Sequence, residues 1–293
     1  PGLTLAASSP NNSLCIFGNG SKTLWTFKFF NTGNERSLAG WSKWIMPSPV
    51  EMVGYDHDTG YFVCRNGTSH VLLKMEMLDD PRTSPITAFG SKFSPRLDHS
   101  LLKSQTTVAA SSVTGKKIIR FPAGSFVADM QPTVILTLDG NSTLYRSPAI
   151  ESDSTGSFIT LDEDLASQDY ILGLDYDMKI KLPSFFVKEE KRADRLNIPM
   201  IENVYIDLYY SGRYSVDIDR RGYDLKTVDL DTTIADIYAA NAAAIDEIST
   251  QQIPVYSRGD YATLTIKASD PLPASITSYR WEGHYNNRGV RLM

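Results

Sequence analysis

Two similar stretches decide the fold class of this sequence: CIFGNGSKTLWTF at residues 15–27 and FVCRNGTSHVLLK at residues 62–74. Each joins two apolar runs through an Asn-Gly pair, and Asn19 and Asn66 lie 47 positions apart. Asn-Gly between apolar runs predicts a hairpin with a type I′ turn, which needs positive φ at both central residues. A four-stranded propeller blade takes roughly 40–50 residues. Further strands at 41–46 and 52–55 would therefore complete blade-like meanders.

The rest of the chain continues this pattern, with short apolar runs between Gly, Asn, Asp and Ser and almost no helical periodicity. We predict an all-β fold in which propeller-like β-meander blades are joined to a β-sandwich region. The expected domains are blades at 1–80, a β-sandwich region at 81–183 and a C-terminal β-region at 184–293. The further strands expected are 106–110, 118–121, 134–138, 143–146, 157–161, 170–174, 176–182, 197–210, 213–219, 253–256, 262–268 and 276–281.

One segment predicts a short helix, at residues 231–249. Asp231 or Thr232 could cap its start, and six alanines between 235 and 244 are strong helix formers. The strands at 197–210 and 213–219 are expected to turn on each other at Ser211-Gly212. Trp41 and Trp44 are three positions apart and cannot share one face of a regular strand, because strand faces alternate. One of them would then lie at a strand end or a bulge, and core packing is favoured for both over a sugar-stacking platform.

The composition argues against several classes of protein. The chain has 293 residues and a formal net charge of −5, and its densest basic runs, 116–120 and 188–195, are short. A protein that grips DNA by its phosphates needs clustered Lys and Arg. No apolar run reaches the roughly 18 residues of a membrane span, so we expect no membrane insertion. Cys15 and Cys64 predict two small buried side chains rather than a disulfide framework.

No pattern in the sequence indicates a catalytic or metal site. The four histidines are scattered without ligand spacing, and no phosphate loop or nucleophile elbow is present. Asp56–Gly60 begins like a calcium loop but lacks the later ligands, so a polar turn is favoured. The Asn-X-Ser/Thr triplets at Asn19 and Asn66 are better explained as turns than as glycan acceptors. We therefore expect no enzyme activity, no cofactor and no metal.

Several landmarks together resemble the tail tubular protein B (tail nozzle) family of podoviruses, the short-tailed bacteriophages. The ending, with SDPLP at 269–273 and YRWEGHYNNR at 279–288, is similar to that family's ending. So are GLDY at 173–176 before KLP at 181–183, the stretch 195–212, and Trp25–Phe30 before Trp41–Trp44. Leu97-Asp98-His99 is a further match. Asp175 stands where the family usually has Pro, and Asp194 where it has Gly.

The resemblance implies a structural role in the virion tail. It implies a homo-hexamer that docks to the tail adaptor protein, supports tail fibres and lets double-stranded DNA pass through its lumen without sequence-specific binding. Members are usually longer, which implies that the chain corresponds to a C-terminal portion. Trp281, Glu282 and Tyr285 are the interface candidates, although for Trp281 packing in a core is favoured over docking. The alternative function is a β-propeller or sandwich tail protein that binds or hydrolyses glycans.

Overall fold

A computed structural model describes residues 2–32, 35–77, 80, 95–111, 116–127, 129–138, 141–145, 148–162, 165, 168–189, 192–193, 198–236, 242–245 and 247–285. Over these ranges the protein is built from antiparallel β-strands, with one 3-10 turn at Lys103–Gln105 and no α-helix. The chain forms two compact units. Unit 1 contains Pro1–Asp80 and Leu97–Leu174, and unit 2 contains Pro81–Arg96 and Asp175–Met293.

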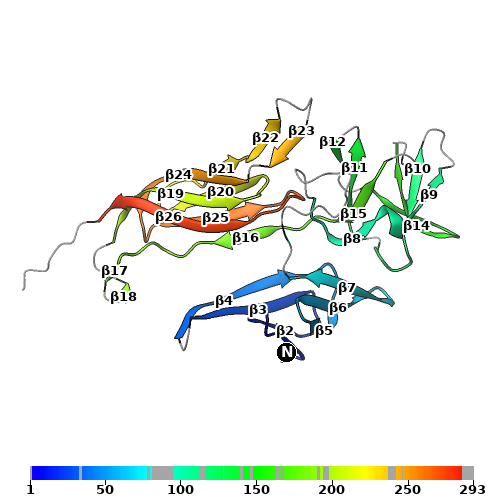
Figure 1. The fold of residues 1–293 in the computed structure, drawn as a ribbon, viewed down its shortest axis with the longest axis horizontal. Helices are drawn as coiled ribbons and strands as arrows, with labels where there is room; N and C mark the ends of the chain where they lie inside the picture. The colour runs from blue at the N-terminus through cyan, green and yellow to red at the C-terminus, as the bar shows by residue number, and fades with distance from the viewer. Residues whose placement is uncertain are drawn as a thin grey trace, which may run out of the picture. The chain divides into compact units, whose positions relative to one another are not determined.

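The sequence repeat forms two meanders in unit 1 (Figure 1). The first has four strands, β1 (Leu5–Ser9), β2 (Leu14–Gly18), β3 (Thr23–Thr32) and β4 (Glu35–Ile45). The second has three, β5 (Val50–Asp56), β6 (Thr59–Asn66) and β7 (Ser69–Glu76). The copies expected from the sequence are the hairpins β2–β3 and β6–β7, which confirms the repeat.

The turns of these hairpins differ from the type I′ expectation. Only the glycine of each Asn-Gly pair has positive φ, 78° at Gly20 and 62° at Gly67. In the second copy Asn66 still pairs with Ser69, so Gly67 is the first central residue of a two-residue turn. Positive φ there alone is the type II′ pattern. The Asp56–Gly60 segment is the polar β5–β6 turn that was expected, with His57 at φ 51°.

The two meanders pack against each other through one apolar core. Leu14, Ile16 and Leu24 from the first meet Phe62 and Cys64 from the second. The alternation of strand residues places these side chains on the inner faces of both sheets. The described residues thus hold two face-to-face meanders and no closed propeller.

Residues 97–174 add two more four-stranded sheets to unit 1. One has the order β13-β14-β10-β9 and the other β12-β11-β15-β8, and both contribute to one core. Their bounds are β8 (Asp98–Leu102), β9 (Thr107–Ala110), β10 (Lys117–Arg120), β11 (Pro132–Leu138), β12 (Asn141–Tyr145), β13 (Ile150–Asp153), β14 (Gly156–Leu161) and β15 (Tyr170–Leu174).

The buried amide of Asn66 ties the second meander to this region. Its Nδ2 donates to the carbonyl oxygens of Gly124 and Ser125 at 2.6 and 2.9 Å, and its Oδ1 accepts from Ser48 at 2.9 Å. Asn66 is only 4% exposed, so this position holds a turn and not a glycan.

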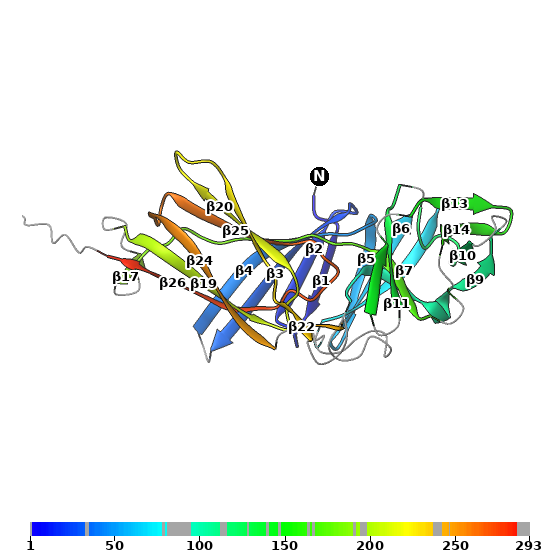
Figure 2. The same ribbon diagram turned by 90° about the horizontal axis from the view of Figure 1, so that it is seen from above.

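Unit 2 is a two-layer β-sandwich (Figures 1 and 2). One layer has the order β24-β19-β26 and the other β16-β25-β20-β21, and their facing side chains form a single core. The bounds are β16 (Met178–Lys181), β19 (Met200–Tyr209), β20 (Tyr214–Arg220), β21 (Lys226–Leu230), β24 (Ile248–Arg258), β25 (Ala262–Ala268) and β26 (Ile276–His284). Two short hairpins complete it: β17 (Lys188–Glu189) with β18 (Arg192–Ala193), and β22 (Thr233–Asp236) with β23 (Ala242–Ile245).

The helix predicted at residues 231–249 is wrong. The segment contains the antiparallel hairpin β22–β23, and β24 starts at Ile248. Thr232 does not cap a helix, because its hydroxyl donates to the carbonyl oxygens of Ser211 and Gly212. Helix propensity, even that of alanine, is a weak determinant that tertiary context overrides.

The hairpin expected at Ser211-Gly212 is also wrong. β19 and β20 are strands, but they belong to different layers, so the chain crosses from one layer to the other between them. A Cβ atom on Gly212 would lie 2.4 Å from the Leu272 side chain. This position therefore needs glycine for close packing.

Candidate interaction surfaces

The outer face of the β1–β4 sheet carries a cluster of aromatic side chains. Because Leu14, Ile16 and Leu24 point into the core, their neighbours point outward. The resulting aromatic face consists of Phe17, Trp25, Phe27, Phe29 and Trp41. Trp41 is 66% exposed, and its ring centroid lies 4.9 Å from that of Phe27 and 5.7 Å from that of Phe17. The other rings of the cluster are half-buried or at most 36% exposed, so Trp41 is its most exposed member and the cluster is a candidate interaction site.

The two tryptophans of β4 lie on opposite faces, as their spacing requires. Trp41 is opposite Phe27 on the aromatic face, whereas Trp44 is opposite Leu24 and packs against the core. The expectation of core packing is met for Trp44 and is wrong for Trp41. The cysteines divide in the same way, because Cys64 is 1% exposed and Cys15 lies half-buried on the outer face.

A second apolar surface lies on the outer face of the β5–β7 sheet. Met52, Val63 and Leu72 are directly opposite one another on the three strands, and we call them the apolar row. Met52 is 64% and Leu72 is 63% exposed. Beside the row, the Glu51 carboxylate lies 3.5 Å from Arg65 Nε and 2.9 Å from His70 Nε2. The two meanders therefore expose apolar side chains on both outer faces of one two-layer body.

The three interface candidates from the sequence lie on or just after β26. Trp281 is half-buried, packs against the unit 2 core and makes an edge contact with Phe185 at 6.5 Å between centroids. Glu282 is exposed and accepts a hydrogen bond of 2.8 Å from the Tyr205 hydroxyl. Tyr285 follows the last strand residue. β26 is an edge strand of its three-stranded sheet, and in the described part of the chain no further strand pairs with its outer side.

Asp207 is the centre of the polar outer face of this same sheet. Its carboxylate accepts hydrogen bonds from Ser278 and Thr250 and lies 3.2 Å from Arg280 Nη1. The bond from Ser278, then that from Thr250, lowers the pKa of Asp207. The Arg280 guanidinium also lies over the Tyr205 ring at 5.0 Å. The contacts span β19, β24 and β26, and they hold the sheet's outer face in one arrangement.

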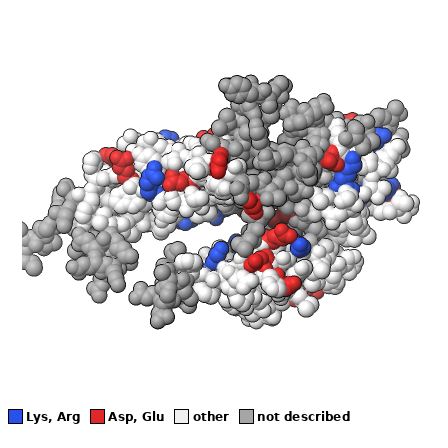
Figure 3. All heavy atoms as spheres, in the orientation of Figure 1, with Lys and Arg blue, Asp and Glu red and all other residues white. Residues whose placement is uncertain are grey.

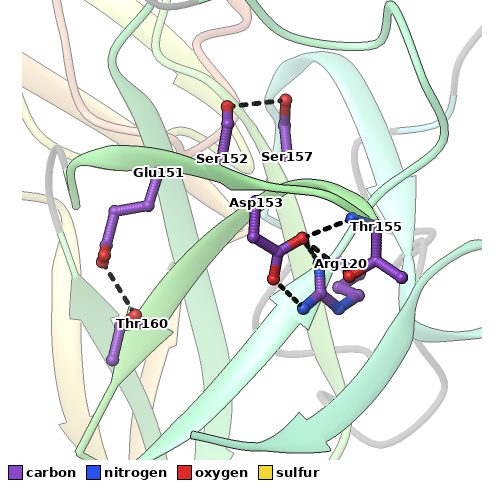
Figure 4. A network of polar contacts seen from close by, with 7 residues as sticks. All are labelled: Arg120, Glu151, Ser152, Asp153, Thr155, Ser157 and Thr160. Carbon is purple, nitrogen blue, oxygen red and sulfur yellow. Dashed lines mark hydrogen bonds and ion pairs between the residues drawn. The ribbon is translucent and has the colours of Figure 1, made fainter. Parts of the chain in front are cut away.

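A comparable network crosses β10, β13 and β14 (Figure 4). The Arg120 guanidinium forms a forked ion pair with Asp153, with Nη1 2.9 Å from Oδ1, and the same carboxylate accepts from the Thr155 amide at 2.8 Å. The bond from Arg120 holds the pKa of Asp153 well below its usual range. Thr160 donates to Glu151 at 2.9 Å, and the Ser152 and Ser157 hydroxyls pair on the opposite face of the hairpin. In Figure 4, the carboxylates of Glu151 and Asp153 both accept hydrogen bonds. These bonds stabilise the β13–β14 hairpin.

The described residues form hollows on the surface but no cluster that could hold a metal ion. Among the described residues, no group of three or more His, Cys, Asp and Glu could hold a metal ion. A hollow of about 330 Å³ is lined by Lys103, Thr106, Val108, Lys117 and other residues of that region, and its lining includes no carboxylate. No helix among the described residues could span a membrane.

The chain is nearly all-β, and its distinctive features are exposed sheet faces, an edge strand and polar networks that cross several strands. These are the surfaces expected of an assembly protein. The family model described as bacteriophage nozzle protein matches residues 3–292. The chain therefore belongs to the bacteriophage nozzle protein family and is a structural protein of the phage tail.

The other comparisons add little. No curated protein matches the sequence significantly. Among solved structures, the exo-β-1,3-galactanase of Phanerochaete chrysosporium with galactose is 8% identical, covering 92% of this chain and 78% of that chain, with a TM-score of 0.16. A variant of that enzyme with β-1,3-galactotriose is 9% identical, covering 94% and 80%, with a TM-score of 0.14. Scores this low carry no argument about fold or activity.

Proposed function

We propose that this chain is a subunit of the tail nozzle, in which six copies close a ring around a channel that conducts double-stranded DNA during ejection. In this role the chain docks to the tail adaptor, supports tail fibres and performs no catalysis. The family match over nearly the whole chain is the observation that carries the proposal.

The two exposed sheet faces of unit 1 support assembly into a ring. A closed ring uses heterologous contacts, in which two different patches of each subunit meet. The aromatic face and the apolar row are two such patches, on opposite sides of the same pair of meanders.

The charge distribution supports a channel that does not hold DNA. The chain carries a net charge of −5. On the face in Figure 3, acidic and basic side chains occur singly or in small mixed groups. Tight phosphate binding requires a continuous basic surface. DNA passes through such a protein without sequence-specific binding.

The edge strand β26 is our candidate for docking to a neighbouring subunit or to the adaptor. Its open backbone edge allows a strand to be added, with Glu282 and Tyr285 as side-chain contacts. Trp281 holds β26 against its own core, so the loss of Trp281 would act through folding as well as docking.

Electron microscopy of the purified chain tests the proposal. The expected class averages show a six-fold ring with a central hole, and Glu282→Arg at the β26 edge is expected to reduce adaptor binding while Glu76→Arg on β7 does not. A monomeric protein that cleaves or binds bacterial surface glycans would contradict the proposal and replace it with a receptor-directed function.

A further inference from the structure

We propose that Asn19 is a site of spontaneous deamidation, and that the equivalent Asn66 of the sequence repeat is protected from this reaction. Both asparagines are followed by glycine, the neighbour that obstructs the reaction least because it has no Cβ atom. The two positions therefore share the same local chemistry. They differ in how the fold holds the side-chain amide, and this difference is independent of the proposed nozzle function.

The reaction needs only the chain itself and water. The backbone nitrogen of the residue after asparagine attacks the side-chain carbonyl carbon. A C–N bond forms to that nitrogen, the bond from the carbonyl carbon to Nδ2 breaks, and ammonia leaves with the proton of the backbone amide. Water then opens the resulting cyclic imide at either of its carbonyl groups. The products are aspartate and isoaspartate, and each places a new negative charge on the chain.

The turn between β2 and β3 holds Asn19 in a form that can react. Its Oδ1 accepts a hydrogen bond of 3.3 Å from the Ser21 amide, which curls the side chain toward the backbone that follows it. Asn19 is half-buried, and among the described residues its Nδ2 donates to no acceptor. A Cβ atom built on Gly20 would meet nothing within 4 Å, so the space around the attacking nitrogen is open.

The turn between β6 and β7 holds Asn66 in a form that cannot react. Its Nδ2 donates to the carbonyl oxygens of Gly124 and Ser125 at 2.6 and 2.9 Å, and its Oδ1 accepts from Ser48 at 2.9 Å. These bonds must break before the amide can turn toward Gly67 and release ammonia. The side chain is 4% exposed, so water is excluded as well. Asn66 can therefore react only in molecules that open locally.

The two turns also differ in how they tolerate a carboxylate. At position 66 it would direct an acceptor at two carbonyl oxygens that now receive donors, and buried polar groups without a partner are destabilising. At position 19 it would still accept from the Ser21 amide. Asn66→Asp is therefore expected to lower the thermal unfolding temperature clearly, whereas Asn19→Asp should leave it nearly unchanged.

The isoaspartate product has a further effect, because it lengthens the backbone of the β2–β3 turn by one carbon atom. This turn bonds to the segment that joins the two meanders. The Ser21 carbonyl accepts from the Val50 amide at 3.1 Å, and the Lys22 carbonyl accepts from the Met46 amide at 2.8 Å. A longer backbone displaces both carbonyl groups. Chains that carry isoaspartate at position 19 are therefore expected to unfold at a lower temperature than fresh chains.

Peptide mapping of the aged full chain tests the proposal. The purified protein is incubated at mildly alkaline pH, where the backbone amide loses its proton more readily, and mass spectrometry then quantifies the acid forms at both positions. In the native chain Asn19 is expected to deamidate about tenfold faster than Asn66 or more, because only Asn66 depends on local opening. In guanidinium chloride the two rates should be similar, since the fold that distinguishes the positions is absent.

Ser48→Ala separates the effect of the fold from that of the sequence. It removes the donor to Asn66 Oδ1, and it is expected to raise the rate at Asn66 several-fold while the rate at Asn19 stays the same. Thermal unfolding checks that the variant folds. An unchanged rate at Asn66 in this variant would show that its hydrogen bonds give no protection.

Two results with the unsubstituted chain would overturn the proposal. One is equal rates at Asn19 and Asn66 in the native protein. The other is an Asn19 that stays intact in the native protein while it reacts in guanidinium chloride. Either result would leave the nozzle function standing, because the six-fold ring in electron microscopy tests that function separately.

Discussion

Asp98 is an unusual residue because it is a half-buried carboxyl at the start of β8, opposite Leu174 of β15. Burial raises the pKa of this carboxyl to about 6. An unfolded aspartate titrates near about 3.9, so the folded protein binds the proton more tightly. The stability that this group provides is complete below about pH 4 and is lost as the pH rises through about 6.

Asp98→Asn should therefore stabilise the protein in a pH-dependent way. At pH 7.5 the variant is expected to gain on the order of 2 kcal/mol in free energy of unfolding, because the ionised carboxylate is removed from a buried site. Near pH 4 the gain should vanish. Urea unfolding at both pH values measures the gain in free energy of unfolding. Asp56→Asn, at the exposed β5–β6 turn, is the control. An equal effect of Asp98→Asn at both pH values would contradict the buried titration.

Single residues also show what the sequence could and could not predict. The spacing of Trp41 and Trp44 was enough to place them on opposite faces. The alternation of strand residues does not predict whether the outer face of the sheet is covered by other residues. The exposure of Trp41 therefore could not be predicted. Asn66 was predicted as a turn residue, but its bonds to Gly124 and Ser125 join positions 58 and 59 residues apart, which no local pattern reports.

At the scale of elements, local alternation was a reliable guide to strands and a poor guide to their partners. Hairpins such as β2–β3 and β6–β7 were predicted because their pairing is local. Strands β19 and β20 were predicted as strands but wrongly paired with each other. β19 pairs with the distant strands β24 and β26, and β20 pairs with the distant strand β25 and with the following strand β21. The alanine run led to the wrong prediction of a helix. Helix propensity has only a weak influence, and tertiary contacts decide which structure forms.

Gly283 shows how one position controls the pairing of two strands. A Cβ atom there would lie 2.0 Å from the Met200 carbonyl oxygen, where β26 passes the irregular end of β19. Gly283→Ala is expected to force the strands apart and lower the free energy of unfolding by about 3 kcal/mol or more.

Gly54→Ala in β5 is the matched control, because its added Cβ meets nothing within 4 Å. It should be neutral or slightly stabilising, since alanine reduces the entropy of the unfolded chain. Chemical denaturation of both variants measures how much each substitution changes the free energy of unfolding. Similar values for the two substitutions would argue against the close β19–β26 approach.

At the scale of the whole molecule, the net charge and its distribution determine how strongly the protein binds DNA. With a net charge of −5 and no continuous basic stretch, the chain should not retain double-stranded DNA. At about 0.15 M salt we expect a dissociation constant weaker than about 100 μM, the weak limit of ordinary non-specific binding. Fluorescence anisotropy with a labelled duplex measures it. A dissociation constant near 1 μM would contradict a non-adhesive channel.

The path of the chain between its units has a mechanical consequence. The chain changes unit after Asp80, after Arg96 and after Leu174, and the Arg96 amide bonds to the Pro271 carbonyl within unit 2. Three covalent crossings therefore link the units where two consecutive domains would have one. A pulling force between the units is shared by three peptide connections, and a protease must cut all three before the halves can separate. Load sharing of this kind suits the proposed role of the chain as a subunit of a channel that conducts DNA.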